Sequence, residues 1–110
     1  MDQYPDRKNR SARRLELQAK LTKLAPKAWY QKPPANQMTY PCFVYKAIQP
    51  KVVYANNHGY LTIPGYEVLY ISQTEEDGIW QKMLEEFCYC SPGTKYVSDQ
   101  LYHYPFTIYY

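Results

Sequence analysis

The chain is poor in the residues from which catalytic and metal sites are most often built. Its 110 residues include only two histidines, three cysteines and four glycines. The scattered glycines form no glycine-rich loop that could cradle a phosphate group. Cys42, Cys88 and Cys90 are an odd number and the histidines lie far apart, so they predict neither a disulfide framework nor a four-ligand zinc site. We therefore expect reduced cysteines, no metal and no cofactor.

A long hydrophobic run is also missing. No apolar stretch approaches the roughly 20 residues that a helix needs to cross a bilayer. The first residues have no signal-peptide core either. We expect the protein to be made and kept in the cytoplasm, or to assemble there.

The two histidines have no sequence neighbours that indicate catalysis. His58 lies in a predicted turn and His103 in the last predicted strand, and neither has a recognisable nucleophile setting. A pairing of His103 with Cys88 or Cys90 in the folded chain stays open, because spatial neighbours need not be sequence neighbours. The main expectation is that the protein is not an enzyme.

Tyrosine, in contrast, is abundant. There are 14 tyrosines, and five of them lie in the segment "KYVSDQLYHYPFTIYY" at residues 95–110. Tyrosine combines a large contact area with a polar hydroxyl, and it is enriched in protein interfaces. Single tyrosines can simply face water from a sheet, but so many predict a surface that another protein covers.

Positive charge is concentrated near the start of the chain, although the net charge is only +3. A mild excess does not by itself indicate nucleic-acid binding. We expect residues 1–10 to form a flexible basic arm that is solvated, grips an acidic neighbouring protein or approaches DNA; of the two binding roles, we favour the neighbouring protein. Five of the 13 basic residues lie within one window of eight: Arg7, Lys8, Arg10, Arg13 and Arg14.

Helical periodicity predicts two helices. The first covers residues 11–25, where Leu17, Leu21 and Leu24 form one apolar stripe, and Pro26 ends it. The second covers residues 74–87. Its apolar stripe consists of Ile79, Trp80, Met83, Leu84 and Phe87.

The remaining segments predict strands and one long loop. Residues 26–41 contain four prolines and predict a loop, with Trp29 and Tyr30 either closing over the core or facing a partner. Alternating and β-branched residues predict strands at 42–48, within 51–73 on both sides of a turn at 55–59, at 94–99 and at 101–110. The segment "SPG" at residues 91–93 predicts a turn.

Helix, three strands, helix and two strands together predict one α+β domain over residues 11–110. Its sheet is mixed and mainly antiparallel, has about five strands, and carries both helices on one face. Residues 66–71 are apolar on both faces and predict a central strand. Pro105 predicts that the last strand is an edge strand or has a bulge.

Two segments resemble a family of small proteins of tailed bacteriophages, the tail terminators. The resemblance covers roughly residues 38–110 and leaves out the basic arm and the proline-rich loop. In "YANNHGYLTIPGYEVLYIS" it rests on Tyr54, Asn56, Asn57, Tyr60, Tyr66, Glu67 and Val68. In "YCSPGTKYVSDQLYHYPFTIYY" it rests on Tyr96, Asp99, Leu101, His103 and Phe106, before a closing aromatic pair.

The resemblance implies a structural protein of the virion. Members of this family are α+β subunits that form a ring, commonly a hexamer, on the last turn of the tail tube. The ring stops polymerisation of the tube and joins the tail to the neck and head. The partners implied are other copies of the chain, the tail tube protein and a neck or connector protein. Genome DNA passes through the lumen without specific binding, and the location is the tail–neck junction after assembly in the host cytoplasm.

The residues expected at the subunit or tail–neck interfaces are mainly aromatic. We expect residues 106–110 to form an edge strand at or beside a subunit boundary. The expected interface residues are Arg7, Arg10, Trp29, Tyr30, Tyr54, Tyr60, Phe106, Tyr109 and Tyr110. Two alternatives stay open: a head-completion or stopper protein of the neck, and a small RNA-binding regulatory module with basic and aromatic residues on its strands.

Overall fold

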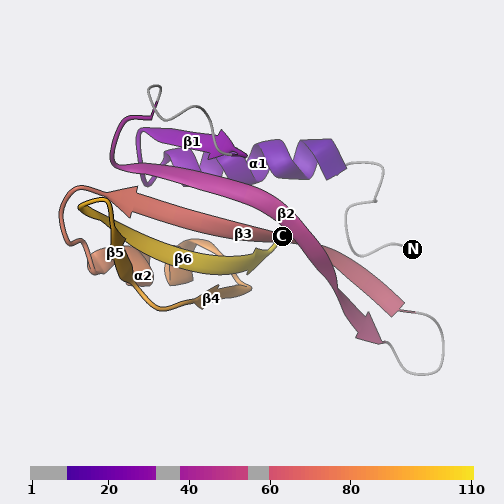
Figure 1. Cartoon of the computed structure of the whole chain (residues 1–110). Helices are drawn as coiled ribbons and strands as arrows, with labels where there is room; N and C mark the ends of the chain where they lie inside the picture. Colours follow the sequence, from indigo (N-terminus) through magenta and orange to yellow (C-terminus); the bar gives the residue numbers. More distant parts are fainter. Residues whose placement is uncertain (1–9, 32–37, 55–59) are drawn as a thin grey trace.

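The computed structural model describes residues 10–31, 38–54 and 60–110 of the chain (Figure 1). Residues 1–9 of the flexible arm predicted at residues 1–10 and the predicted turn at 55–59 lie outside the described residues. Arg10 is helical, which corrects the predicted end of that arm. The elements are α1 (Arg10–Thr22), β1 (Lys27–Tyr30), β2 (Cys42–Tyr54), β3 (Tyr60–Ser72), α2 (Gly78–Glu86), β4 (Cys90–Pro92), β5 (Tyr96–Ser98) and β6 (Leu101–Tyr109).

The strands form one mixed, mainly antiparallel sheet, and the predicted α+β architecture is confirmed. The sheet has six strands in the order β1-β2-β3-β6-β4, and β5 also pairs with β6. Only β1 and β2 are parallel. Figure 1 shows both helices behind the sheet, with α1 near β1 and β2 and with α2 near β4 and β5. The opposite face of the sheet carries no described helix.

Side-chain alternation places the core between the sheet and the helices. Tyr45, Val68 and Phe106 lie opposite one another on three neighbouring strands, and all are buried. Because strand side chains alternate with a period of two, the same register turns every second residue of these strands toward the helices. The other strand residues of this core are Phe43, Tyr66, Tyr70, Tyr104 and Ile108.

Both predicted helical stripes complete the same core. Leu17 and Leu21 of α1 are fully buried, and Ile79 and Met83 of α2 are nearly so. Residues at i and i+4 lie on one face of a helix, so each helix covers the sheet with a single apolar stripe. The amphipathic pattern thus predicted these buried residues, but its assignment of Leu84 to the apolar stripe of α2 is wrong, because Leu84 is 50% exposed.

The prediction of an edge position for the last strand is wrong. β6 lies inside the sheet, with β3 on one side and the short strands β4 and β5 on the other. Pro105 occupies the gap between these two short strands, because β5 pairs with residues 101–103 of β6 and β4 pairs with residues 106–108. Proline has no N–H to donate, so it fits the one place where this ladder is interrupted. Its carbonyl accepts a hydrogen bond of 2.7 Å from the Gly93 N–H.

Three other predicted boundaries also need correction. Residues 27–30, predicted as loop because of nearby prolines, form the edge strand β1. Residues 42–54 form one strand instead of two, because a register shift between Ile48 and Lys51 accommodates Pro50 without ending the strand. The segment "SPG" at residues 91–93, predicted as a turn, is partly strand, because Ser91 and Pro92 belong to β4.

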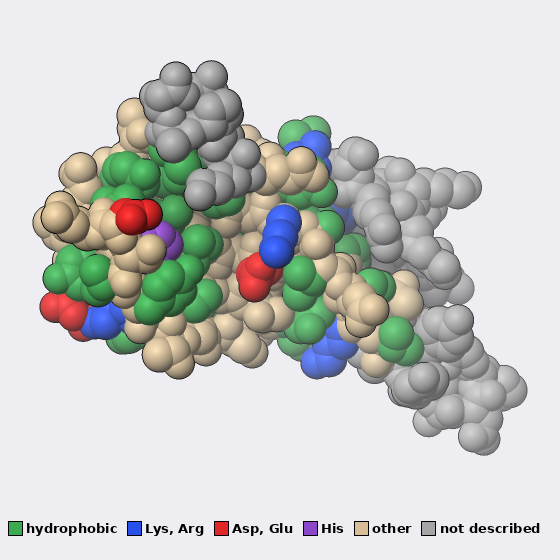
Figure 2. Space-filling view, viewed as in Figure 1, with side chains coloured by type: hydrophobic (Ala, Val, Ile, Leu, Met, Phe, Trp, Pro, Cys, Tyr) green, Lys and Arg blue, Asp and Glu red, His purple; other side chains and the backbone are tan. Residues whose placement is uncertain are grey.

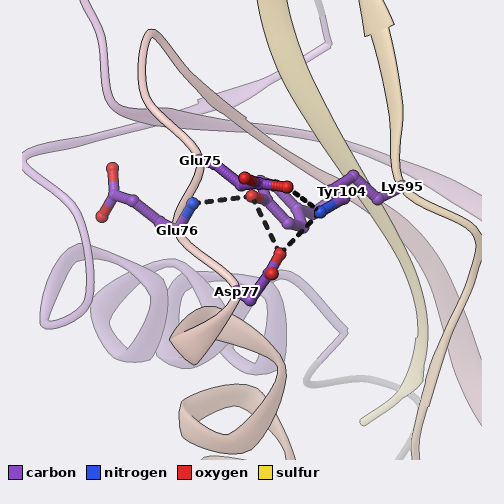
Figure 3. A network of polar contacts seen from close by, with 5 residues as sticks. All are labelled: Glu75, Glu76, Asp77, Lys95 and Tyr104. Atoms are coloured by element: carbon purple, nitrogen blue, oxygen red, sulfur yellow. Dashed lines mark hydrogen bonds and ion pairs between the residues drawn. The ribbon is translucent and has the colours of Figure 1, made fainter.

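Helix α2 begins at Gly78 instead of residue 74, because the residues before it are held in a polar network. The Glu76 carboxylate accepts hydrogen bonds from the hydroxyls of Ser72 (2.5 Å) and Tyr70 (3.1 Å). The Glu76 backbone N–H donates to the Tyr104 hydroxyl at 2.7 Å. Lys95 bridges the carboxylates of Glu75 and Asp77 (Figure 3). This network fastens the β3–α2 connection to β3, β6 and the segment before β5.

Glu76→Gln is expected to lower the free energy of unfolding by about 1–3 kcal/mol, because a carboxamide cannot accept from Ser72 and Tyr70 as a carboxylate does. Ser72 is 1% exposed, so water does not readily replace the lost acceptor. Urea unfolding followed by circular dichroism measures the change. Glu85→Gln is the matched control, since Glu85 accepts an exposed hydrogen bond from Gln81. Equal effects of the two substitutions would contradict the role of Glu76.

Candidate protein interface

The sheet face without a described helix is partly apolar. Val44, Leu69 and Pro105 lie opposite one another on β2, β3 and β6, and each is half-buried. Figure 2 shows green hydrophobic side chains gathered on this face around one histidine. A groove of about 680 Å³ follows the face and is lined in part by Val44, Leu69, Tyr96 and Pro105. We call this surface the helix-free face.

An ion pair lies among these apolar residues. The Lys46 ammonium is 3.2 Å from the Glu67 carboxylate, and both side chains are more than half exposed. An exposed pair of this kind contributes little to folding stability. Its position beside Leu69 gives the helix-free face a charged spot that a partner could recognise.

At one end of the helix-free face, Tyr96 stacks on His103. Their ring centroids are 4.8 Å apart and the rings are nearly parallel, at 8°. The Nδ1 atom of His103 is 3.0 Å from the Leu101 carbonyl, which fixes the imidazole. Tyr96 remains 47% exposed and extends the aromatic surface to β5.

The alternative pairing of His103 with Cys90 is wrong. Cys90 pairs with Ile108 and packs against the core, whereas His103 faces the opposite side of the sheet. Burial also raises the pKa of the Cys90 thiol to about 11, which disfavours a reactive thiolate. Cys88 is exposed. Among the described residues, no group of three or more His, Cys, Asp and Glu side chains is placed to hold a metal ion.

A two-stranded arm projects from the sheet. Residues 49–54 of β2 and 60–64 of β3 lie beyond the last residue of β3 that β6 reaches, Gly65. Figure 1 shows this pair of strands extending away from the helices, and the longest dimension of the molecule is 50 Å. A two-stranded ribbon without further support is marginally stable in water. We call these residues the arm, a name that from here on does not refer to the basic arm predicted at residues 1–10. We infer that the arm is stabilised by contacts at its base or by a partner.

The end of β6 holds the base of the arm. The Tyr110 N–H donates to the Pro64 carbonyl at 2.9 Å, and the Tyr109 N–H donates to the Tyr89 carbonyl at 3.0 Å. The Lys51 ammonium lies 5.5 Å from the ring centroid of Tyr89 and 5.8 Å from that of Tyr109. These contacts tie the arm to the strand that ends beside it.

Tyr110 also contacts α1. Its hydroxyl donates to the Glu16 carboxylate at 3.0 Å, and the Arg13 guanidinium lies 4.3 Å from its ring centroid. Burial and the nearby Glu16 carboxylate raise the pKa of the Tyr110 hydroxyl. Tyr109 and Tyr110, expected at an interface, therefore have contacts within their own chain and remain only partly exposed.

The structure places the other expected interface residues differently. Phe106 is 1% exposed in the core, so its assignment to an interface is wrong: its side chain faces the helices, not a partner. Tyr30 is exposed on β1 with the Arg14 guanidinium 4.3 Å above its ring centroid. Trp29 pairs with Val44 and so shares the helix-free face. Its indole N–H is buried and has no hydrogen-bond partner among the described residues.

The remaining expected residues are described only in part or not at all. Tyr54 and Tyr60 pair through their backbones in the arm, and their side chains lie outside the described part of the chain. Arg10 is the first residue of α1, and its side chain is likewise not described. Arg7 lies outside the described residues.

The residues that sequence reasoning missed are those of the helix-free face. Val44 and Leu69 alternate along β2 and β3 with the buried residues Tyr45 and Val68, so they face the other side of the sheet. Pro105 was noted only for its effect on strand pairing. The sequence analysis identified residues 66–71 as apolar on both faces, but it did not extend this second apolar face to Val44 or Pro105.

Comparisons with known proteins identified no protein similar to this chain. No family model matches the chain, and searches of curated proteins and of solved structures find no match. In the described residues, neither helix is long and apolar enough to cross a membrane.

Proposed function

We propose that the protein is a structural subunit of a tailed-phage virion, a tail terminator that forms a ring, expected to be a hexamer, on the end of the tail tube. The observation that carries this proposal is the helix-free face, a partly apolar side of the sheet that no described helix covers. Contiguous apolar surface that stays accessible is a feature of contacts with other proteins. The proposed role is contact, without catalysis and without a cofactor.

The arrangement of the two segments that resemble tail terminators supports the proposal. The first segment forms β3 and the second forms β6, and the two strands pair from Gly65 to Ser72 of β3. Among the resembling residues that the structure describes, Val68 of β3 and Phe106 of β6 are thus direct neighbours in the sheet. Glu67 and His103 lie on the helix-free face, while Val68 and Phe106 lie in the core beneath it.

A ring subunit needs several different contact surfaces. Each copy in a ring buries two different patches against its two neighbours. In this proposal a third patch faces the tail tube and a fourth faces a neck or connector protein. We assign the helix-free face to the tail tube. Genome DNA passes through the lumen without specific binding, and the ring is assembled in the host cytoplasm and remains at the tail–neck junction.

The test is capping of purified tail tubes in the absence of heads. We expect the wild-type protein to bind tube ends as a ring-sized particle and to stop tube growth, measured by light scattering and electron microscopy. Tyr96→Lys places a charge on the helix-free face and is expected to weaken capping at least about tenfold, a loss of about 1.4 kcal/mol.

Leu84→Lys is the matched control. Leu84 is 50% exposed on α2, on the other side of the sheet, so the control introduces the same charge with a similar exposure. Both variants should keep wild-type stability, because exposed substitutions usually change it by less than about 0.5 kcal/mol. A protein that ignores tubes but binds the neck would overturn the terminator role in favour of a neck stopper. Binding to RNA alone would favour the regulatory module.

A further inference from the structure

The charges of this chain are divided between its two halves. Residues 1–66 contain eleven Lys and Arg against three Asp and Glu, a net charge of +8. Residues 67–110 contain two Lys against seven Asp and Glu, a net charge of −5. The mild overall charge of +3 therefore hides a strong asymmetry of the kind that indicates an electrostatic contact.

The sheet order turns this division of the sequence into a division in space. The basic half supplies α1, β1 and β2, and the acidic half supplies α2, β4, β5 and β6. β3 lies between them, so the outer strands β1 and β5 belong to halves of opposite charge. The two halves also meet behind the sheet, where Lys20 of α1 and Lys23, just after it, pair with Glu86 of α2. Figure 1 shows α1 and β1 along one border of the molecule and α2, β4 and β5 along the other.

The basic edge combines charge with an apolar groove. Lys27 of β1 is exposed, and Arg14 of α1 lies over the ring of Tyr30. A shallow groove of about 350 Å³ runs between α1 and β1, and Ala28 and Trp29 contribute to its lining. In the sheet order of the described strands, β1 has a neighbour only on its β2 side. A second surface can therefore approach β1 from outside.

The acidic edge offers the complementary features. Lys95 is shared between the carboxylates of Glu75 and Asp77, which leaves a negative excess at this place. Asp99, in the turn between β5 and β6, is exposed. Val97 of β5 is 61% exposed and offers the apolar group.

We infer that the edge formed by α1 and β1 of one copy of the chain contacts the edge formed by β5 and the start of α2 of the next copy. The charge complementarity of the two edges identifies the partner as a second copy. Because the two contacting surfaces differ, the contact is heterologous, and its repetition closes a ring or continues as a filament. The inference rests on the proposed ring, and it names the surfaces that the ring buries between subunits.

The test uses two variants that each damage one edge. Lys27→Glu reverses a charge at the basic edge, and the double variant Glu75→Lys/Asp99→Asn removes the negative excess at the acidic edge. Asparagine suits position 99 because the backbone there has a φ of 52°. Each variant alone is expected to stay monomeric at concentrations at which the wild type assembles, alone or on tail tubes, measured by sedimentation velocity at low and raised salt.

A one-to-one mixture of the two variants gives the decisive result. Each variant keeps the edge that the other has lost, so the mixture is expected to form a dimer and to stop there. Lys82→Glu, the matched control, has the same charge change at an exposed position of α2 that lies outside both edges and outside the helix-free face, and it should assemble like the wild type. Raised salt should weaken wild-type assembly, because exposed charges are screened.

The outcomes separate this inference from the proposed function. If the wild type assembles and the edge variants assemble equally well, the edges are not the interface, while the ring remains. If either variant alone forms dimers, the contact is isologous and the inference is wrong. A wild type that assembles neither alone nor on tail tubes would overturn the ring itself, and the edge contact with it.

Discussion

Phe106→Ala is expected to lower the free energy of unfolding by about 3–5 kcal/mol, the range for removal of a buried aromatic ring. Phe106 is 1% exposed and lies opposite Val68 in the middle of the sheet, beneath the helices. Alanine would leave a cavity that the surrounding strands cannot fill, since their register is fixed by pairing on both sides of β6. Urea unfolding of the monomer followed by circular dichroism gives the change.

Thr107→Ala is the control for Phe106→Ala. Thr107 is the next residue of β6, faces the opposite side of the sheet and is half-buried. We expect a loss below about 1 kcal/mol for this variant. A loss of similar size for both variants would show that the position in β6, not the core side chain, determines the effect. If Phe106→Ala alone is strongly destabilised and also fails to assemble, that failure reflects loss of folding and not loss of an interface.

Gly65→Val is expected to displace the arm and to lower the free energy of unfolding by about 1–3 kcal/mol, the usual cost of overpacking. A Cβ atom at this position would lie 2.7 Å from the Gln49 carbonyl oxygen and 2.9 Å from a ring carbon of Tyr109. The carbonyl belongs to the backbone of β2, next to the register shift, so it cannot rotate away as a side chain can. The substitution therefore acts where β2, β3 and β6 meet.

Hydrogen exchange of the arm, together with urea unfolding, tests the effect of Gly65→Val. Backbone amides of residues 49, 51, 52 and 61–63 should exchange faster, because the base that holds the arm is pushed apart. Gly78→Ala is the control, since a Cβ atom there meets nothing within 4 Å. That variant should be neutral or slightly more stable. Unchanged exchange in the arm of Gly65→Val would contradict the role of Gly65 as the point of close approach.

Local patterns predicted the helices, their buried stripes and the long hairpin. Leu17 and Leu21 repeat at helical spacing, so short-range periodicity was sufficient to identify them as core. Residues 66–71 are apolar on both faces, so periodicity predicted a central strand without showing which face meets the helices. β1 was missed because the prolines around it predict a loop, and its pairing with β2 depends on residues that follow about fifteen positions later. β4 has only three residues, too few for a period to be visible, whereas β5 lies within the strand predicted at residues 94–99.

The candidate interface was harder to predict than the fold. An aromatic residue near the end of the chain can be core, as Phe106 is, or can hold the arm, as Tyr109 does, and both have the same local sequence signal. The difference is set by strand order, which places β6 inside the sheet, and strand order depends on contacts between distant parts of the chain. Charge division between the halves was present in the sequence, but only the sheet order shows that it becomes a division between edges.

The position of β6 has a consequence for the synthesis of the protein. β6 lies between β3 on one side and β4 and β5 on the other, and it follows all three strands in the sequence. The Tyr110 hydroxyl even bonds to Glu16, 94 residues earlier in the chain. A nascent chain interrupted before Leu101 has its hairpin and its helices but no strand to join them, so its apolar residues stay exposed to chaperones and proteases. A chain that lacks β6 would therefore be removed by proteolysis instead of accumulating as a defective product.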